Sequence, residues 1–257
     1  MVHVSVIGVG NMGGAFVTGL AREGSHTVTA IDADPDALAA IEPHTEETTT
    51  DLDAAREADV VVLAVKPDVV DAVLSDLDLR ANQTLLTFAA GVGREHVGER
   101  TDATVVRAMP NLAAETGNMA AAVTPNATEE VRALLDAVGE FAEIDESLFD
   151  TATAVNGSGP AFVFYVIDAM KQGGIEGGLD PGDAEVLAAQ TFRGAAETVL
   201  RDDRSVEELI DAVCSPNGTT IEGMNILWDS DVQAEFEAAV CAAKRRSEEL
   251  AAEFENE

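Results

Sequence analysis

A glycine-rich turn close to the N-terminus has the residue types and the spacing of a dinucleotide-binding loop. Gly8, Gly10 and Gly13 form the pattern G-x-G-x-x-G directly after an apolar run, His3–Ile7. The first glycine permits a tight turn, the second lets the backbone approach a pyrophosphate, and the third lets the helix pack closely on the strand. The N–H groups at the start of that helix are free to bind phosphate oxygens. A turn that binds nothing is the disfavoured alternative, because a strand signal precedes the motif and a helix signal follows it.

An acidic residue stands where the ribose of such a cofactor would be bound. Asp32 lies nineteen residues after Gly13, at the end of a second apolar run, Thr27–Ile31. A carboxylate there accepts hydrogen bonds from the adenosine ribose hydroxyls and repels a 2′-phosphate. The surrounding segment 32–36 holds no Lys or Arg that would neutralise such a phosphate. The sequence therefore favours NADH over NADPH, while the acidity of the whole chain offers a second explanation for Asp32.

A second loop, in the C-terminal half, has the chemistry of a carboxylate site. The segment 215–220 reads Ser-Pro-Asn-Gly-Thr-Thr and precedes a helix signal. Asn217 and Gly218 tolerate backbone angles closed to most residues, and Thr219 is a candidate helix cap, with Glu222 three residues later. Free N–H groups and hydroxyls at a positive helix end bind a carboxylate without a formal cation. An ordinary capped loop explains this segment equally well.

The elements that must position these loops follow two different patterns. The N-terminal half alternates strand and helix signals, with a helix expected from about Met12 to Arg22. Strands are expected at 3–7, 27–31, 59–65, 84–88 and 104–108. The run 59–65 is apolar throughout, as is typical of a strand buried on both faces. The alternation predicts an α/β fold, a Rossmann-type doubly wound parallel sheet over residues 1–154.

The C-terminal half, from Ser147 onward, carries no convincing strand and predicts an all-α domain over residues 155–257. Pro160 and Pro181 have the position of prolines in the first turn of a helix. Ser205 and Glu208 have the spacing of a capping box. A final helix is expected to carry one apolar seam, formed by Phe236, Val240, Ala243, Ser247, Leu250 and Phe254.

The helix after Pro160 is apolar on every side, which requires burial all round. A domain of about 100 residues does not supply that burial alone. We therefore expect helices from two subunits to interlock in a homodimer. Burial against the first domain of the same chain is the alternative.

The charge of the chain limits its partners and its environment. Asp and Glu total 48 of 257 residues against 15 Lys and Arg, a formal net charge of −33. Nucleic acid and anionic membranes are poor partners for such a surface. Because the acids are spread over an apolar-patterned chain, we interpret them as an adaptation to a very salty cytoplasm, that is, as halophilic. The two cysteines and four histidines are scattered, so neither a disulfide framework nor a metal site is expected. The sequence shows no signal peptide and no spanning segment, so we expect a soluble, cytoplasmic protein.

Six sequence blocks together resemble one known family. They read GVGNMG, AVKP, RAMPN, NGSGPAFVF, AAQTFRGAA and SPNGTTIEGM. Their order and spacing are similar to those of the pyrroline-5-carboxylate reductases, the last enzymes of proline synthesis, over almost the whole chain. The resemblance implies reduction of 1-pyrroline-5-carboxylate to L-proline by hydride transfer from NAD(P)H. It also implies a helical domain that dimerises by interlocking, and relatives often assemble such dimers into larger rings.

The resemblance also assigns roles residue by residue. The pyrophosphate would be held by Gly8, Gly10, Asn11, Met12 and Gly13. The segment along the nicotinamide ribose would be Ala64, Val65, Lys66 and Pro67, with Ala89 and Ala90 nearby. The substrate would be bound by Ser215, Gly218, Thr219 and Thr220. We expect the Thr220 hydroxyl to bond the ring nitrogen as the catalytic group, with solvent as the proton source.

Four positions depart from the family pattern. Asn217 replaces a glycine, and Asn156 replaces a small hydroxyl residue before GSGPA. Asp51 replaces an asparagine near the adenosine ribose, and Asp32 departs from the many relatives that use NADPH. The two aspartates bear on the choice of cofactor and not on the reaction.

Two rival functions share the same start of the chain. A β-hydroxyacid-dehydrogenase-like reductase would need a lysine on the helix entering the second domain, and residues 160–170 contain none. A non-catalytic dinucleotide-sensing protein would be expected to have a damaged substrate loop, whereas 215–220 is intact.

Overall fold

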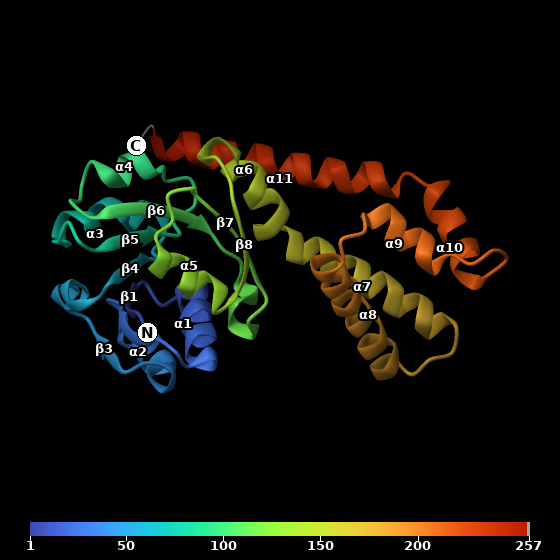
Figure 1. The fold of residues 1–257 in the computed structure, drawn as a ribbon, viewed down its shortest axis with the longest axis horizontal. Coiled ribbons are helices and arrows are strands. Elements are labelled where there is room, and N and C mark those ends of the chain that lie inside the picture. Colours follow the sequence, from blue (N-terminus) through green and yellow to red (C-terminus); the bar gives the residue numbers. More distant parts are fainter. Residues whose placement is uncertain (256–257) are drawn as a thin grey trace. The chain divides into compact units, whose positions relative to one another are not determined.

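The computed structural model describes residues 1–255 and divides the chain into two compact units. The first unit comprises Met1–Gly157 together with Cys241–Glu257, and the second comprises Ser158–Val240. The first unit contains one eight-stranded sheet of order β3-β2-β1-β4-β5-β6-β7-β8 (Figure 1). Its strands are β1 (His3–Ile7), β2 (Thr27–Ile31), β3 (Glu47–Thr49), β4 (Val60–Leu63), β5 (Thr84–Thr87), β6 (Thr104–Met109), β7 (Met119–Val123) and β8 (Gly139–Glu143).

The five strands expected from the sequence are all present, within one or two residues at their ends. They pair in parallel, as expected, and β3 joins them beside β2. Three strands were not anticipated: β3, β7 and β8. The polar three-residue β3 and the half-exposed β8 lack an apolar run, and β7 is mostly alanine, so their sequences carry little strand signal. β7 also runs antiparallel to β6, an exception to the predicted parallel sheet.

Two layers of helices cover the two faces of this sheet, as the doubly wound fold predicts. Alternate residues of the buried strands enter different core clusters: Val60 and Val62 lie in one, Val61 and Leu63 in the other. The first cluster includes residues of α1 and α5, and the second includes residues of α3 and α4. The α-helices of this unit are α1 (Asn11–Glu23), α2 (Pro35–Ile41), α3 (Val70–Asp76), α4 (Arg94–Gly98), α5 (Glu129–Asp136) and α6 (Phe149–Ala152). The short 3₁₀ and π segments are η1 (Glu42–His44), η2 (Leu52–Glu57), η3 (Pro67–Val69), η4 (Leu112–Thr116), η5 (Glu146–Leu148) and η6 (Thr153–Gly157).

The second unit is entirely helical, as predicted. Pro160 and Pro181 both lie in the first turns of helices, and the Ser205–Glu208 capping box is formed in both directions. Thr219 was expected to cap a helix and does not: Gly218 is the N-cap residue and no side chain caps that end. Gly218 has the extended backbone of an N-cap, so Thr219 is already in the first helical turn. The helices are α7 (Gly159–Glu176), α8 (Pro181–Arg201), α9 (Val206–Val213), α10 (Thr219–Trp228) and α11 (Val232–Glu255), whose last turns group with the first unit.

The apolar helix α7 is not buried within the single chain. Phe164 is 67% exposed and Tyr165 is 76% exposed, and no residue of α7 is fully buried. The other helices of the second unit therefore leave these apolar side chains open. On α11 the predicted seam is visible as the less exposed face, except that Leu250 is exposed. The large apolar surface left open on the helical unit is what a dimerisation domain would cover.

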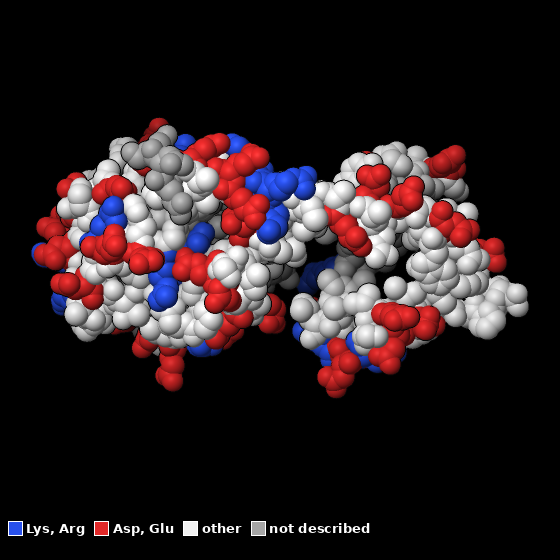
Figure 2. Space-filling view, turned by 90° about the horizontal axis from the view of Figure 1, so that it is seen from above, with Lys and Arg blue, Asp and Glu red and all other residues white. Residues whose placement is uncertain are grey.

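Carboxylates dominate the exposed surface. Figure 2 shows Asp and Glu spread over the visible face, with Lys and Arg in smaller groups. Within residues 1–255 no helix is long and apolar enough to cross a bilayer. The division of function between residues 1–154 and 155–257 stays a prediction. The compact units differ from it because the last turns of α11 pack on the first unit, where Phe254 joins the second core cluster.

Candidate active site

The glycine-rich turn packs against the end of β4 with almost no free space at two of its three glycines. Gly8 has a φ of +88°, and a Cβ there would lie 2.8 Å from Val65 Cγ1. A Cβ on Gly13 would clash with the Gly8 carbonyl oxygen and would lie 3.2 Å from the Ala64 Cβ. The structure thus brings the turn into direct contact with Ala64 and Val65, the first two residues of the predicted segment 64–67.

Gly10 differs from the other two glycines, because a Cβ there would meet nothing within 4 Å. The helix end at this position is also uncapped: Gly10 is the N-cap of α1 and has no side-chain cap. The first α-helical bond runs from Gly14 N–H to the Gly10 carbonyl at 2.8 Å, and no acceptor within residues 1–255 takes the N–H of Asn11, Met12 or Gly13. An open cradle of free N–H groups at a helix N-terminus fits a pyrophosphate.

Asp32 is half-buried at the end of β2, and its carboxylate is tied to the glycine-rich turn. Its Oδ2 accepts a hydrogen bond from the Val9 N–H at 2.8 Å, and its Oδ1 accepts one from the Asp34 N–H at 2.9 Å. Each carboxylate oxygen retains a further lone pair that can accept from a ribose hydroxyl. The contact with Val9 places this carboxylate beside the glycine-rich turn.

The surroundings of Asp32 are acidic. Asp34 and Asp51 cap α2 and η2 with their own carboxylates, and both are exposed. The first basic side chain after Asp32 apart from His44 is Arg56, which forms ion pairs with Asp53 and Asp78. No cation along segment 32–55 is therefore available to neutralise a 2′-phosphate.

The remaining predicted cofactor residues follow the carboxyl ends of β4 and β5. Ala64 N–H bonds the Ile7 carbonyl at 2.8 Å, and Phe88 N–H bonds the Leu63 carbonyl at 2.9 Å, so the three strand ends are in register. Lys66 is exposed and Ala89 is buried, with its N–H held by the Thr87 hydroxyl at 3.2 Å. Ligands of parallel α/β sheets bind at this edge, where the strand order reverses around β1 and β4.

The RAMPN and NGSGP blocks meet through a pair of asparagines, a contact that sequence reasoning missed. Asn156, in η6, donates from Nδ2 to the Met109 carbonyl at 2.7 Å and to the Ala120 carbonyl at 2.9 Å. Asn111 donates in return to the Asn156 carbonyl at 3.0 Å. The available signal was the replacement of a small hydroxyl residue by Asn156, since a longer amide reaches two carbonyls that serine would not.

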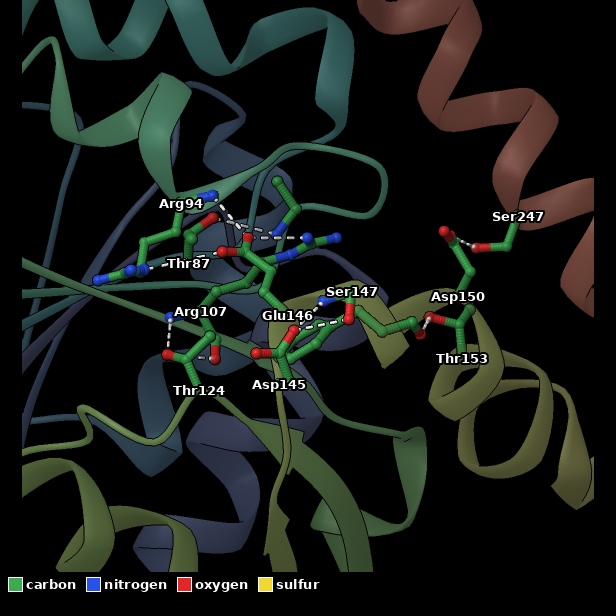
Figure 3. Close-up of polar contacts among 12 residues, drawn as sticks. Thr87, Arg94, Arg107, Thr124, Asp145, Glu146, Ser147, Asp150, Thr153 and Ser247 are labelled. Carbon is green, nitrogen blue, oxygen red and sulfur yellow. Dashed lines mark hydrogen bonds and ion pairs between the residues drawn. The ribbon is translucent and has the colours of Figure 1, made fainter.

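A buried arginine contacts Glu146 and Phe149, which precede Asn156 in the chain (Figure 3). Arg107, in β6, is 8% exposed and donates to Glu146 Oε1 at 3.0 Å. Its guanidinium lies 4.7 Å from the centre of the Phe149 ring, a cation–π contact. Glu146 Oε1 also accepts from the Arg94 N–H at 2.7 Å. These contacts fix the start of the chain that leads from the sheet to α7.

The predicted substrate loop lies in the helical unit. Asn217 has a φ of +59°, the left-handed conformation that its replacement of glycine predicts. The Gly218 N–H bonds the Ser215 carbonyl at 2.9 Å, which closes a tight turn before α10. Ser215, Thr219 and Thr220 are exposed, and no hydrogen bond to their side chains is formed within residues 1–255. Their hydroxyls and the uncapped end of α10 are therefore available to a ligand.

Within residues 1–255 no cluster of three or more His, Cys, Asp or Glu could hold a metal ion. The residues that can bind a cofactor are those of the pyrophosphate cradle and the sheet edge beside it.

A dinucleotide-binding sheet with this cradle, followed by an all-helical unit, defines an NAD(P)-dependent oxidoreductase of the Rossmann type. A family described as NADP oxidoreductase coenzyme F420-dependent matches residues 3–91, and one described as pyrroline-5-carboxylate reductase dimerisation matches residues 146–250. The chain is 37% identical to a pyrroline-5-carboxylate reductase of Methanosarcina acetivorans, over 96% of this chain and 97% of that protein. The chain belongs to the pyrroline-5-carboxylate reductase family.

Two solved structures extend this similarity. A pyrroline-5-carboxylate reductase from Coxiella burnetii has a TM-score of 0.86 and 29% identity, over 97% of this chain and 98% of that one. A pyrroline carboxylate reductase from Plasmodium falciparum, solved with NADP bound, has a TM-score of 0.80 and 25% identity over the same shares. The activity of the chain is therefore NAD(P)H-dependent reduction of pyrroline-5-carboxylate to proline, and its helical unit forms a homodimer. This activity stands against both rival interpretations made from the sequence.

Proposed function

We propose that the chain reduces 1-pyrroline-5-carboxylate with NADH in preference to NADPH, using the residues assigned above. The observation that carries the cofactor preference is the position of Asp32, hydrogen-bonded to Val9 beside the open cradle at Gly10. A 2′-phosphate at this site would face Asp32 and the exposed carboxylates of Asp34 and Asp51, with no free cation from 32 to 55. Ribose hydroxyls would instead donate to Asp32.

The cofactor assignment follows the edge of the sheet. The free N–H groups of Asn11, Met12 and Gly13 bind the pyrophosphate. Ala64, Val65, Lys66 and Pro67 lie along the nicotinamide ribose, and Ala89 and Ala90 lie near the nicotinamide ring. The contact between the glycine-rich turn and Ala64–Val65 supports placing one dinucleotide along both segments.

The substrate is held by the loop before α10. The hydroxyls of Ser215 and Thr219 and the N–H groups around Gly218 bind the carboxylate at the positive helix end. The Thr220 hydroxyl bonds the ring nitrogen. The exposure of these hydroxyls, together with their lack of protein partners within residues 1–255, supports this role.

The main task of the protein in this reaction is to position the imine against the nicotinamide. The bound nicotinamide supplies a hydride to carbon five of the cyclic imine, and a proton from solvent completes the amine of proline. The carboxylate site and Thr220 orient the imine so that carbon five meets the hydride at a near-attack distance. Because a protonated imine is already electrophilic, no buried general acid is required.

The assembly and the setting of the enzyme complete the proposal. The homodimer buries the apolar side chains left exposed on α7, and a ring of several dimers remains a further possible assembly. We place the enzyme in a cytoplasm of high salt, because a net charge of −33 repels itself at low ionic strength.

The test is NADH oxidation by the purified protein in about molar potassium chloride, a concentration at which charges are strongly screened. The assay is run with and without racemic pyrroline-5-carboxylate, and then repeated with NADPH. Substrate-dependent oxidation with proline as product, faster with NADH, is the expected result. Oxidation faster with NADPH would overturn the cofactor preference. A folded sample that oxidises neither cofactor would overturn the proposed reaction.

A further inference from the structure

The last turns of α11 press on the loop that follows β5. Gly91, in this loop, has a φ of +75°. A Cβ on Gly91 would lie 3.2 Å from the Ala251 Cα and 3.4 Å from the Ala251 nitrogen. Both atoms belong to the main chain of α11, so a side chain at residue 91 would require the loop or the whole helix to shift. The loop and the helix are therefore in contact without spare room.

Two further contacts fix this part of α11 on the same unit. The Ser247 hydroxyl donates to Asp150 Oδ1 at 2.6 Å, a bond visible in Figure 3. The Phe254 ring lies edge-on to His96 of α4, with 5.1 Å between ring centres, and packs on the second core cluster. Ala251 lies between these two anchors in the sequence, so its position against the loop is set from both sides.

The loop is a tight turn, closed by a hydrogen bond from the Val92 N–H to the Ala89 carbonyl at 3.5 Å, and Val92 is fully buried. The Ala89 N–H is held by the Thr87 hydroxyl at 3.2 Å, and the Arg94 N–H is held by Glu146 at 2.7 Å. Within residues 1–255 no hydrogen bond is formed by the main chain of Ala90 or Gly91. Between the buried residues Ala89 and Val92, packing against Ala251 therefore limits how far Gly91 can move outward.

We propose that the contact between Gly91 and Ala251 positions the loop for the nicotinamide half of the cofactor. Both are positioning residues: neither touches substrate or cofactor, and both act through Ala89 and Ala90. The inference rests on the proposed function, because that function places Ala89 and Ala90 near the nicotinamide. The adenosine half, at Gly10 and Asp32, is independent of this contact.

If the contact positions the loop, a change at residue 251 is expected to weaken binding of NADH but not of ADP-ribose. Ala251→Leu enlarges a side chain whose Cβ lies 3.7 Å from where a Gly91 Cβ would stand, and it is expected to displace the loop. A full ångström of misplacement costs about 100-fold in rate. We expect NADH to bind about tenfold more weakly and kcat to fall, whereas ADP-ribose, which lacks the nicotinamide, binds as it does to the wild type. Both dissociation constants are measured by calorimetry on the dimer, in about molar potassium chloride.

Ala242→Leu is the matched control, since it makes the same substitution at an exposed alanine of α11. Gly91→Ala tests the same contact from the loop side if Ala251→Leu does not fold. Equal weakening of NADH and ADP-ribose would show a merely structural role and overturn the proposal, as would no weakening of either. If the wild type itself neither binds NADH nor reduces the substrate, it is the proposed function that fails. If the wild type is active and Ala251→Leu binds NADH and turns over as the wild type does, only the inference about Gly91 and Ala251 fails.

Discussion

Two side chains carry most of the functional argument at the residue scale. Asp32 has a defined place because it accepts hydrogen bonds from Val9 and Asp34, which hold its carboxylate beside the cradle. Thr220 has no such partner within residues 1–255, and its exposed hydroxyl in the first turn of α10 is open to a ligand. The Asp32 carboxylate is thus already held by the protein, whereas the Thr220 hydroxyl is free for the role proposed for it.

Asp32→Ser is expected to weaken the preference for NADH. Serine removes the charge that repels a 2′-phosphate, and it gives up charged hydrogen bonds to the ribose worth about 1.5–3 kcal/mol. We expect kcat/KM to fall about tenfold or more with NADH and to rise with NADPH, as measured by steady-state kinetics. Asp136→Ser, an exposed acid in α5, controls for the loss of one charge. An unchanged ratio of the two cofactors would contradict the role of Asp32.

Thr220→Val is expected to lower kcat/KM for the imine about 100-fold, because it keeps the shape of the side chain and removes the hydroxyl that orients the ring nitrogen. The dissociation constant of NADH, measured separately, is expected to stay unchanged. Thr198→Val is the matched control, since its hydroxyl is engaged with the Gly194 carbonyl. Intact turnover and substrate affinity in Thr220→Val would show that this hydroxyl has no such role.

At the scale of elements, two glycines of the turn between β1 and α1 have different surroundings: Gly13 is closely packed and Gly10 is open. A Cβ on Gly13 would collide with the Gly8 carbonyl, whereas one on Gly10 would meet only open space. Gly10 has a φ of −67°, outside the left-handed region that favours glycine. The close packing of helix on strand therefore depends on Gly13, and the open space in which we propose the pyrophosphate binds lies at Gly10.

Gly13→Ala and Gly10→Ala form a matched pair of variants. Gly13→Ala is expected to reduce the free energy of unfolding by about 1–3 kcal/mol, because it overpacks a closed contact. Gly10→Ala is expected to change that free energy by about 0.5 kcal/mol or less and to weaken NADH binding about tenfold. Denaturant unfolding and calorimetric titration measure the two effects. The reverse pattern, with Gly10→Ala unstable and Gly13→Ala neutral, would contradict the arrangement of the turn.

The whole molecule is shaped by its charge and by the apolar surface of its helical unit. Self-repulsion from a net charge of −33 opposes both folding and the association of two like-charged chains. The exposed apolar residues of α7 favour association. Salt screens the repulsion and so favours folding and association.

Thermal stability is therefore expected to rise with potassium chloride. The screening length falls from about 10 Å at 0.1 M to about 3 Å at 1 M, so repulsion between neighbouring carboxylates weakens over this range. A series of melts, with sedimentation at the same concentrations, is expected to show a higher Tm and a larger dimer fraction as salt increases. A Tm that does not depend on salt would contradict the interpretation of the acidic surface.

Stability is also expected to fall on the acid side because of His26. Its side chain is 6% exposed, and its Nδ1 has no hydrogen-bond partner within residues 1–255. Burial lowers the pKa of His26 by more than the nearby Glu23 raises it. The fold therefore favours the neutral ring, and the stability it contributes is complete above the unfolded pKa of about 6.5 and is lost as the pH falls below it. Denaturant unfolding at constant salt is expected to show a shallower acid slope for His26→Gln, and an unchanged slope would contradict this assignment.

The local features of the protein follow from its amino-acid sequence alone. The glycine pattern, the apolar runs of β1, β2, β4, β5 and β6, the helix-starting prolines and the capping box depend on neighbouring residues, so they can be read in order along the chain. The sequence blocks also identified the family, because their order is a property of the chain. The weak strands β7 and β8 escaped prediction, because their pairing with the rest of the sheet, and not their own composition, makes them strands.

Which residues far apart in the sequence meet is seen in the folded chain and not in the sequence. The bonds from Asn156 to the Met109 and Ala120 carbonyls span 47 and 36 residues, and the approach of Ala251 to Gly91 joins the last turns of the chain to the middle of the sheet. Gly218, and not the predicted Thr219, is the N-cap residue of α10, because the backbone angles and not the residue type set where the helix begins. Such contacts depend on where the folded backbone places each residue in space, and spacing along the sequence does not contain that information.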